Sequence, residues 1–211
     1  LLYEELGMIE GTPVRSCAYP KNHKDAFYDL SLAPSILEFY INYIAPYEYD
    51  KLDNVQSTTR FGGMENAGCI FYDEDALSGQ QSSENLIAHE IVHQWFGNSA
   101  TEKDWCHLWL SEGFATYLTN VYIEQTKGQE AFQEQLKQDR NRIVSFEKRY
   151  KAPVVDTAYS SLMDLLNPNS YQKGGWVLHM LRNEIGDESF HQTIRSYYKK
   201  YRLSNADTRD F

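Results

Sequence analysis

Two histidines, His89 and His93, constrain the chain more than any other feature, because they stand four residues apart in a largely apolar run. On an α-helix such positions differ in direction by only about 40°, so both imidazoles leave one face, one turn apart. This spacing suits two nitrogen ligands of one tetrahedral zinc ion, and Glu90 stands where it can reach a water on the metal. The pattern predicts a zinc-binding helix whose base is Glu90.

Two surface histidines at helical spacing would give the same pattern. The residues between and after the histidines are apolar or aromatic: Ile91, Val92, Trp95 and Phe96. They indicate a buried helix, in which a histidine needs a polar partner because an unpaired polar group is costly in an apolar interior. The surroundings therefore favour metal ligands.

A third ligand is expected from a different element, since a catalytic zinc site takes three protein ligands and leaves one position for water. The segment from Trp109 to Tyr117 is a second apolar stretch with helical character, and it carries one acid, Glu112. A carboxylate among apolar neighbours is costly unless a cation satisfies it, which favours Glu112. On this argument Glu102 and Asp104 remain alternatives.

Composition limits the classes of protein to which the chain can belong. Its 211 residues suffice for one substantial domain, and 42% hydrophobic with 14% aromatic residues exclude a disordered chain. A net charge of -10 argues against a nucleic-acid partner, and no apolar run is long enough for a membrane span. The acidic balance favours cationic ligands such as peptide amino termini, or simply provides solubility. Three cysteines without a disulfide or CxxC pattern leave the compartment open.

Strand-like segments precede a run of helical segments, which predicts an α+β fold with a small sheet first. Strands are expected around Val14–Cys17 and Phe27–Tyr28, and a helix between Pro34 and Pro46. Segments from Lys51 to Arg60 and from Cys69 to Tyr72 flank a glycine-rich turn and suggest a hairpin. Further helices are expected at about 82–96, 107–125, 129–150, 170–185 and 187–202.

The HExxH motif, followed after 18 intervening residues by Glu112, resembles the gluzincin peptidases. Together with Gly63-Met64-Glu65-Asn66 upstream, it resembles the M1 aminopeptidases, a family that includes aminopeptidase N, aminopeptidase B and leukotriene A4 hydrolase. The likeness covers about residues 50–180. It continues through residues 93–98 (HQWFGN), 109–114 (WLSEGF) and 171–174 (YQKG).

This resemblance implies a thermolysin-like zinc metallopeptidase catalytic domain, with a small mixed β-sheet followed by a predominantly helical part. We expect residues 1–211 to form a single domain of this kind. Residues 1 to about 80 would hold the sheet and the substrate-binding loop, and about 81–211 the helices with the zinc site. The β-rich N-terminal and helical C-terminal domains that flank it in the family are expected to lie outside this chain, which we expect to be a fragment.

For the site, the resemblance implies one Zn²⁺ per chain, held by the two histidines and Glu112. It also implies that a loop lies along the bound peptide, with Glu65 binding the free α-amino group. A carboxylate paired with an ammonium group in a dry cleft selects for a chain end. The loop consists of Gly62, Gly63, Met64, Glu65 and Asn66. Without the resemblance, this segment is typical of a glycine-rich hairpin turn.

Tyr171 is one of sixteen tyrosines, and nothing local distinguishes it from a core or surface tyrosine. The resemblance implies that its hydroxyl stabilises the oxyanion formed as water attacks the scissile carbonyl. The chain departs from the common pattern at three positions. Gly63 stands where many members have Ala, Ser111 replaces the commoner Asn, and Thr116 replaces the Asp of thermolysin-type enzymes.

The function expected from the site is a zinc-dependent aminopeptidase. It would hydrolyse the N-terminal peptide bond of peptides with a free N-terminus, using metal-activated water and a glutamate base. The alternatives are a zinc endopeptidase or an epoxide hydrolase on the same fold, and a family member without catalytic activity. Glu65 argues against the endopeptidase, and the intact set of ligands and base argues against loss of activity.

Overall fold

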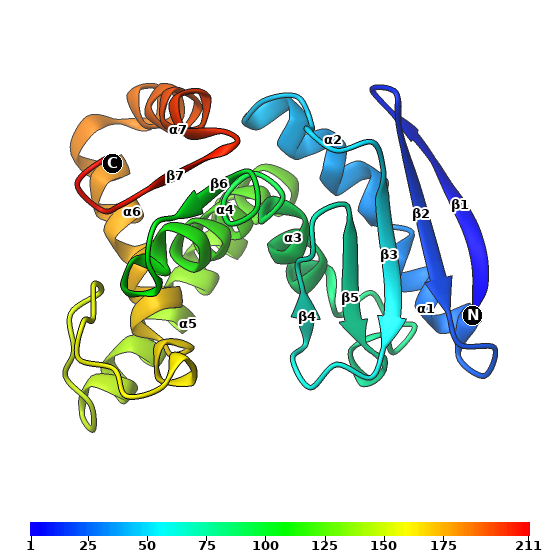
Figure 1. The fold of residues 1–211 in the computed structure, drawn as a ribbon, viewed down its shortest axis with the longest axis horizontal. Coiled ribbons are helices and arrows are strands. Elements are labelled where there is room, and N and C mark those ends of the chain that lie inside the picture. Colours follow the sequence, from blue (N-terminus) through cyan, green and yellow to red (C-terminus); the bar gives the residue numbers. More distant parts are fainter. The chain divides into compact units, whose positions relative to one another are not determined.

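The computed structural model describes all of residues 1–211 and comprises two compact units, Leu1–Gln94 (unit 1) and Trp95–Phe211 (unit 2). Unit 1 contains a β-sheet with helices, and unit 2 is predominantly helical (Figure 1). The sequence of elements, a small sheet first and helices after it, confirms the expected α+β fold. No helix is both long and apolar enough for a membrane span.

The sheet of unit 1 is mixed, with the strand order β1-β2-β3-β5-β4. Its strands are β1 (Leu2–Ile9), β2 (Thr12–Ala18), β3 (Leu52–Ser57), β4 (Gly63–Met64) and β5 (Cys69–Asp73). The three central strands, β2, β3 and β5, are parallel to one another, and the two edge strands are antiparallel to their neighbours. Along β2, buried and half-buried residues alternate, as expected for a strand with one face on the core.

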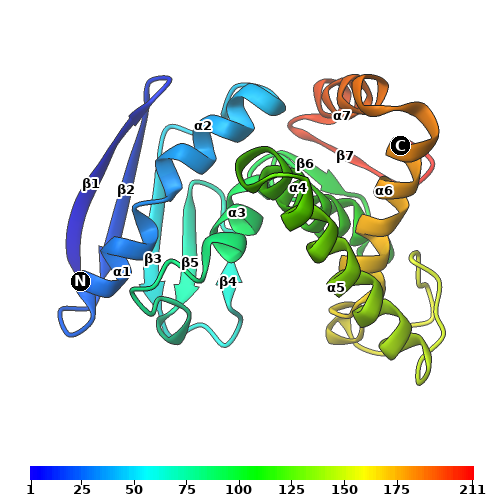
Figure 2. The same ribbon diagram turned by 180° about the vertical axis from the view of Figure 1, so that it is seen from behind.

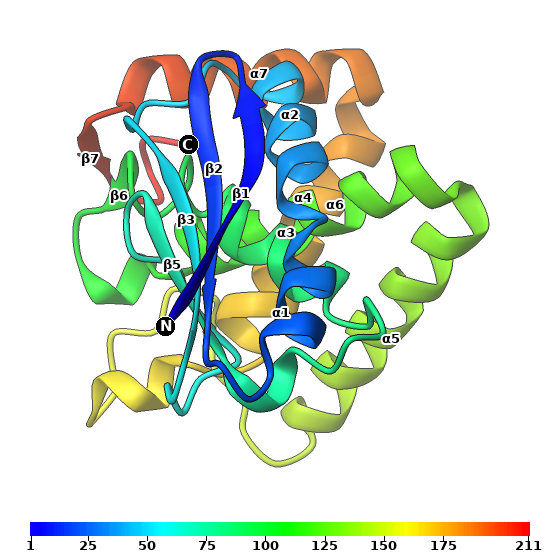
Figure 3. The same cartoon turned by 90° about the vertical axis from the view of Figure 1, so that its right-hand side faces the viewer.

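Helices α1 (His23–Leu30), α2 (Ala33–Tyr43) and α3 (Glu84–Val92) lie on the same face of this sheet (Figures 2 and 3). A short 3₁₀ turn, η1 (Glu74–Ala76), follows β5. Apolar residues of α2 recur at helical spacing and are fully buried: Ile36, Leu37 and Tyr40. This periodicity explains why the segment after Pro34 is a helix, as expected.

Two expectations for unit 1 are wrong. Phe27 and Tyr28 lie in α1 and not in a strand, because Ala26 and Leu30 are buried one helical turn apart. The segments Lys51–Arg60 and Cys69–Tyr72 do not form a hairpin, since β3 and β5 are parallel. The connection between them is long enough to carry the chain back, and within it β4 pairs antiparallel with β5.

Unit 2 consists mainly of four helices, which confirm the expected helices within a few residues at each end. They are α4 (Trp109–Lys127), α5 (Gln129–Glu147), α6 (Gly174–Ile185) and α7 (Asp187–Tyr201). Gly128 ends α4 and Gly186 ends α6, each with a positive φ that glycine adopts without strain. The shorter elements are η2 (Trp105–His107), η3 (Leu162–Leu165), the π-helix η4 (Asn169–Lys173), and the parallel strands β6 (Ala100–Glu102) and β7 (Ser204–Ala206).

Candidate functional site

The rings of His89 and His93 in unit 1 direct their Nε2 atoms toward each other. The His93 N–H donates to the His89 carbonyl at 3.3 Å, so the helical spacing of the two residues is preserved. Their Nε2 atoms lie 3.1 Å apart, and His93 is only 1% exposed. Two nitrogens bound to one tetrahedral zinc at 2.0–2.1 Å would be roughly 3.3–3.4 Å apart. The pair therefore fits a zinc ion with little movement of either ring.

The helix that carries these histidines ends earlier than expected, at Val92 and not near Phe96. The N–H of Gln94 donates to the Ile91 carbonyl at 3.1 Å, three residues back, so the helix closes in a tighter turn. The apolar residues after His93 therefore belong to the turn that follows and do not extend the helix.

The glycine-rich loop of unit 1 runs beside α3. A Cβ atom at Gly62 would lie 3.5 Å from Leu86 Cδ1, an ordinary contact. A Cβ atom at Gly63 would overlap the Glu90 carboxylate, so that carboxylate occupies the space a side chain would need. Glu90 itself is only 5% exposed. The structure thus brings the loop and the candidate base together, a contact that sequence reasoning missed.

The rest of the loop is fixed by hydrogen bonds. Met64 pairs with Phe71 in the sheet, and Asn66 is exposed while its carbonyl accepts the N–H of Cys69 at 2.9 Å. The carbonyl of Glu65 accepts a hydrogen bond from Gln94 Nε2 at 2.9 Å. Leu86 and Glu90 of α3 and Gln94, two residues beyond its end, all lie against the loop.

The sheet of unit 1 contains one buried tyrosine. Tyr72 of β5 is fully buried and donates a hydrogen bond to Asn54 Oδ1 at 3.1 Å. Burial raises the pKa of the Tyr72 hydroxyl well above its ordinary value, and the nearby charge of Glu90 raises it further. Tyr72 is therefore a neutral hydrogen-bond donor at physiological pH.

In unit 2, Glu112 lies in the first turn of α4 and is only 6% exposed. The Tyr171 hydroxyl donates to Glu112 Oε1 at 2.8 Å, so two residues singled out by the resemblance are in direct contact. The close approach of α4 to α6 beside these residues depends on glycine. A Cβ atom on Gly113 would lie 2.8 Å from the carbonyl carbon of Gly174. Gly113, next to Glu112, and Gly174, three residues after Tyr171, allow the two segments to come this close.

Tyr171 lies within the π-helix η4, whereas the sequence predicted an α-helix from Ser170. The N–H of Lys173 donates to the Pro168 carbonyl at 2.8 Å, five residues back. Single π-turns are rare and frequently occur at functional sites. Lys173 itself pairs with Glu147 and donates to the Ala152 carbonyl at 3.0 Å, so its charge has a structural role.

The two acids that the sequence left as alternatives to Glu112 lie just before α4 in the chain. Glu102 accepts a hydrogen bond from the Ser111 hydroxyl at 2.6 Å. Asp104 precedes the 3₁₀ turn η2 in an extended conformation. Neither belongs to the group of side chains that could hold a metal ion.

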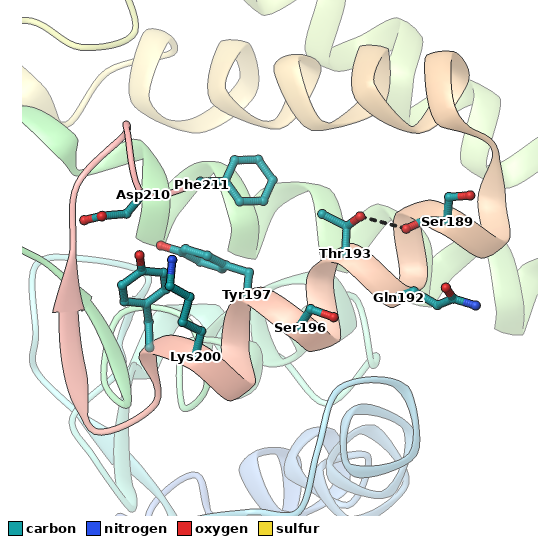
Figure 4. A pocket seen from close by; sticks show the side chains of 9 residues that line it. Ser189, Gln192, Thr193, Ser196, Tyr197, Lys200, Asp210 and Phe211 are labelled. Carbon is teal, nitrogen blue, oxygen red and sulfur yellow. Dashed lines mark hydrogen bonds between the residues drawn. The ribbon is translucent and has the colours of Figure 1, made fainter.

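Unit 2 also has an open pocket between α7 and the C-terminal residues (Figure 4). Its wall is polar where Ser189, Thr193 and Lys200 line it, and aromatic at Tyr197 and Phe211. None of the residues that the sequence predicts for the site lines this pocket.

Comparison with known proteins identifies relatives over nearly the whole chain. The chain is 34% identical to aminopeptidase M1-B of Oryza sativa subsp. japonica, over 99% of its own length and 25% of the relative. It is 30% identical to glutamyl aminopeptidase of Sus scrofa, over 95% of its length and 23% of the relative. The chain therefore spans about a quarter of the length of the curated relatives it matches.

Solved structures share the fold. Native leukotriene A4 hydrolase from Saccharomyces cerevisiae aligns with a TM-score of 0.88 at 24% identity, covering 100% of this chain and 35% of that one. An M1 zinc metallopeptidase mutant from Deinococcus radiodurans aligns with a TM-score of 0.77 at 20% identity, covering 99% and 46%. The family model for the "Peptidase family M1 domain" matches residues 28–211. By this match and by the identity to the aminopeptidases, the chain belongs to peptidase family M1.

Proposed function

We propose that the chain is the catalytic part of a zinc-dependent aminopeptidase, which hydrolyses the N-terminal peptide bond of peptides with a free N-terminus. The observation that carries the proposal is the paired Nε2 atoms of His89 and His93 on a helix that also presents Glu90, in a chain of peptidase family M1. The names of the two curated relatives described above, both aminopeptidases, agree with this activity.

One zinc ion would be held by His89, His93 and Glu112. These three side chains form a candidate metal-binding group, and each offers one ligand atom. Two nitrogens and one carboxylate oxygen are the donor set of many catalytic zinc sites, with a fourth position left for water or substrate. When bound, zinc supplies a Lewis acid that polarises the scissile carbonyl and lowers the pKa of water. In this proposal, the two units act together as a single thermolysin-like catalytic domain.

Glu90 is the proposed general base. Its carboxylate would take a proton from the attacking water and deliver it to the leaving amine. Two features of unit 1 support this role: the burial of Glu90 and its direct contact with the loop at Gly63. A base in contact with a peptide-binding loop is close to the bond to be cleaved.

Glu65 is the proposed ligand of the substrate's α-amino group, on the loop from Gly62 to Asn66. An ammonium group offers the carboxylate a charged partner, whereas an internal peptide bond leaves it unpaired. This difference would restrict cleavage to the first residue of a peptide.

Tyr171 is the proposed donor to the oxyanion. In the structure its hydroxyl donates to Glu112, so the side chain is oriented toward a proposed metal ligand. To serve the substrate, the hydroxyl would have to turn its hydrogen from Glu112 toward the carbonyl oxygen.

The proposal is tested with the zinc-loaded 211-residue chain and two substrates, leucine p-nitroanilide and its N-acetyl derivative. We expect hydrolysis of the free amine only, and a loss of about 10²–10⁴-fold in Glu90→Gln with zinc content unchanged. Full turnover by Glu90→Gln would refute the assignment of the base. Cleavage of the acetylated substrate at an equal rate would favour an endopeptidase.

A further inference from the structure

We infer that Gln94 is a positioning residue for substrate recognition, because it fixes the backbone of the loop that carries Glu65 against the end of α3. The inference rests on the proposed function for the role of Glu65 as the ligand of the substrate amine. It adds a residue to which neither the motif pattern nor the family resemblance gave a role.

The side chain of Gln94 is only 1% exposed, and both ends of its amide are used. Its Nε2 donates to the Glu65 carbonyl at 2.9 Å, and its Oε1 accepts the N–H of Gly68 at 2.8 Å. The Tyr47 hydroxyl lies 3.4 Å from the same oxygen. One side chain therefore holds the backbone on both sides of the segment from Glu65 to Gly68.

The orientation of this amide is determined by its partners. Exchanging its oxygen and nitrogen would set two donors against each other at Gly68 and two acceptors at Glu65. Side chains that either only donate or only accept cannot make both bonds. The two bonds therefore require a side chain that, like glutamine, carries both a donor and an acceptor.

The segment that Gln94 holds has little other freedom. Gly68 is buried with φ +67°, and a Cβ atom there would lie 3.1 Å from the Lys51 carbonyl oxygen. The Asn66 carbonyl accepts the N–H of Cys69, which closes the turn. With its backbone fixed at both ends, the Glu65 side chain projects from a defined point.

Gln94 also directly follows His93 in the sequence. The same turn of the chain therefore supplies a proposed zinc ligand and the anchor of the amine-binding loop. Since a substrate must contact the metal and the amine ligand at once, this link would set the distance at which a free N-terminus fits.

The test compares Gln94→Met, which removes both hydrogen bonds at similar volume, with a matched control. Gln56→Met is the control, because Gln56 is equally buried in unit 1, at 1% exposure, and its Oε1 accepts the Tyr19 N–H at 3.0 Å. The probes are leucine hydroxamate, which carries a free amine, and N-acetyl-leucine hydroxamate. Their dissociation constants are measured by calorimetry on the zinc-loaded chain.

We expect the preference for the free-amine probe to fall about tenfold in Gln94→Met, as for the loss of one or two hydrogen bonds. The acetylated probe and the zinc content should be unchanged, and Gln56→Met should keep the wild-type preference. Gln94→Glu keeps the acceptor for Gly68 and loses only the donor to Glu65, so it should also lower the preference. Faster hydrogen exchange of the Gly68 amide in Gln94→Met should accompany the loss.

A double variant separates positioning from a general structural effect. If Gln94 acts through Glu65, adding Gln94→Met to Glu65→Gln should lower the preference no further. A preference abolished by Glu65→Gln but unaffected by Gln94→Met would overturn the inference alone, as would an equal loss in Gln56→Met. A wild-type chain without any preference would overturn the amine-binding role of Glu65 and the inference with it.

Discussion

The two units place glycine against different kinds of neighbour. In unit 1, Gly63 meets the carboxylate of Glu90, the far end of a flexible side chain. In unit 2, Gly113 meets the backbone of Gly174, which cannot rotate away. The comparison teaches that the contact beside the candidate base can adjust, while the contact beside Glu112 and Tyr171 is fixed by the main chain. Substitutions of these glycines test this difference, and two further predictions concern Glu112 and His179 of unit 2, from the largest expected effect to the smallest.

Glu112→Gln should weaken zinc binding by more than the roughly 10–100-fold lost when only a supporting partner of a metal ligand is removed. The amide is neutral and a poorer ligand than the carboxylate. Zinc affinity is measured by competition with a chelator of known affinity. Glu102→Gln is the control, because Glu102 is also an acid of unit 2 with a hydrogen bond, from Ser111. Equal affinity in both variants would remove Glu112 from the ligand set.

Gly113→Ala should destabilise the chain by about 1–3 kcal/mol, because its Cβ atom would lie 2.8 Å from a backbone carbon. The loss should appear even though alanine favours a helix over glycine. The free energy of unfolding is measured by urea denaturation.

Two neighbouring glycines give a graded comparison. A Cβ atom on Gly174 would approach the nearest atoms at 3.1 Å, and one on Gly175 at 3.3 Å. The loss of stability should therefore decrease from Gly113→Ala through Gly174→Ala to Gly175→Ala. A reversed order would show that the distance from the added Cβ atom to its neighbours does not determine the loss of stability.

Gly63→Ala should cost less than about 1 kcal/mol, since the Glu90 side chain can move to another rotamer. The same urea measurement applies, and zinc affinity should stay near the wild-type value because neither histidine is touched. A loss as large as that of Gly113→Ala would mean that the contact in unit 1 is as rigid as that in unit 2.

The smallest effect concerns His179, in α6 of unit 2. Burial lowers its pKa below the ordinary 6.5, and the nearby Arg182 lowers it further. The unfolded chain therefore binds more protons just below pH 6.5, so this contribution to stability is complete above that pH and is lost as the pH falls toward the folded pKa. Thermal unfolding between pH 5 and 7.5 should show a steeper slope in the wild type than in His179→Gln. Identical slopes in the two proteins would contradict the lowered pKa of His179.

Local spacing was enough to predict one half of the candidate site. His89, Glu90 and His93 belong to a single helix, so their relation follows from its geometry. The proposed third ligand was less determined, because burial favoured Glu112 without excluding Glu102 or Asp104. Tyr171 could not be found from its own surroundings, since its contact with Glu112 depends on helices meeting at glycines far apart in the sequence.

The fold was predictable to a similar degree. Helices that stop at a glycine, such as α4 and α6, end near their expected positions. The prediction of a hairpin between β3 and β5 was wrong, because the direction in which two strands pair depends on the path of the connection and not on the strands themselves. The π-helix at Tyr171 stands where an α-helix was expected to begin, because the local sequence does not distinguish a π-turn from an α-helical turn.

The three side chains that meet the loop, Leu86, Glu90 and Gln94, come from α3 and the turn directly after it, and the same short segment carries the two histidines. An extra residue inserted after Leu86 would rotate everything beyond it by about 100° about the helix axis. The candidate base Glu90, the two imidazoles and the Gln94 amide would then all lose their present contacts. The geometry of the candidate site therefore depends on the exact length of this segment.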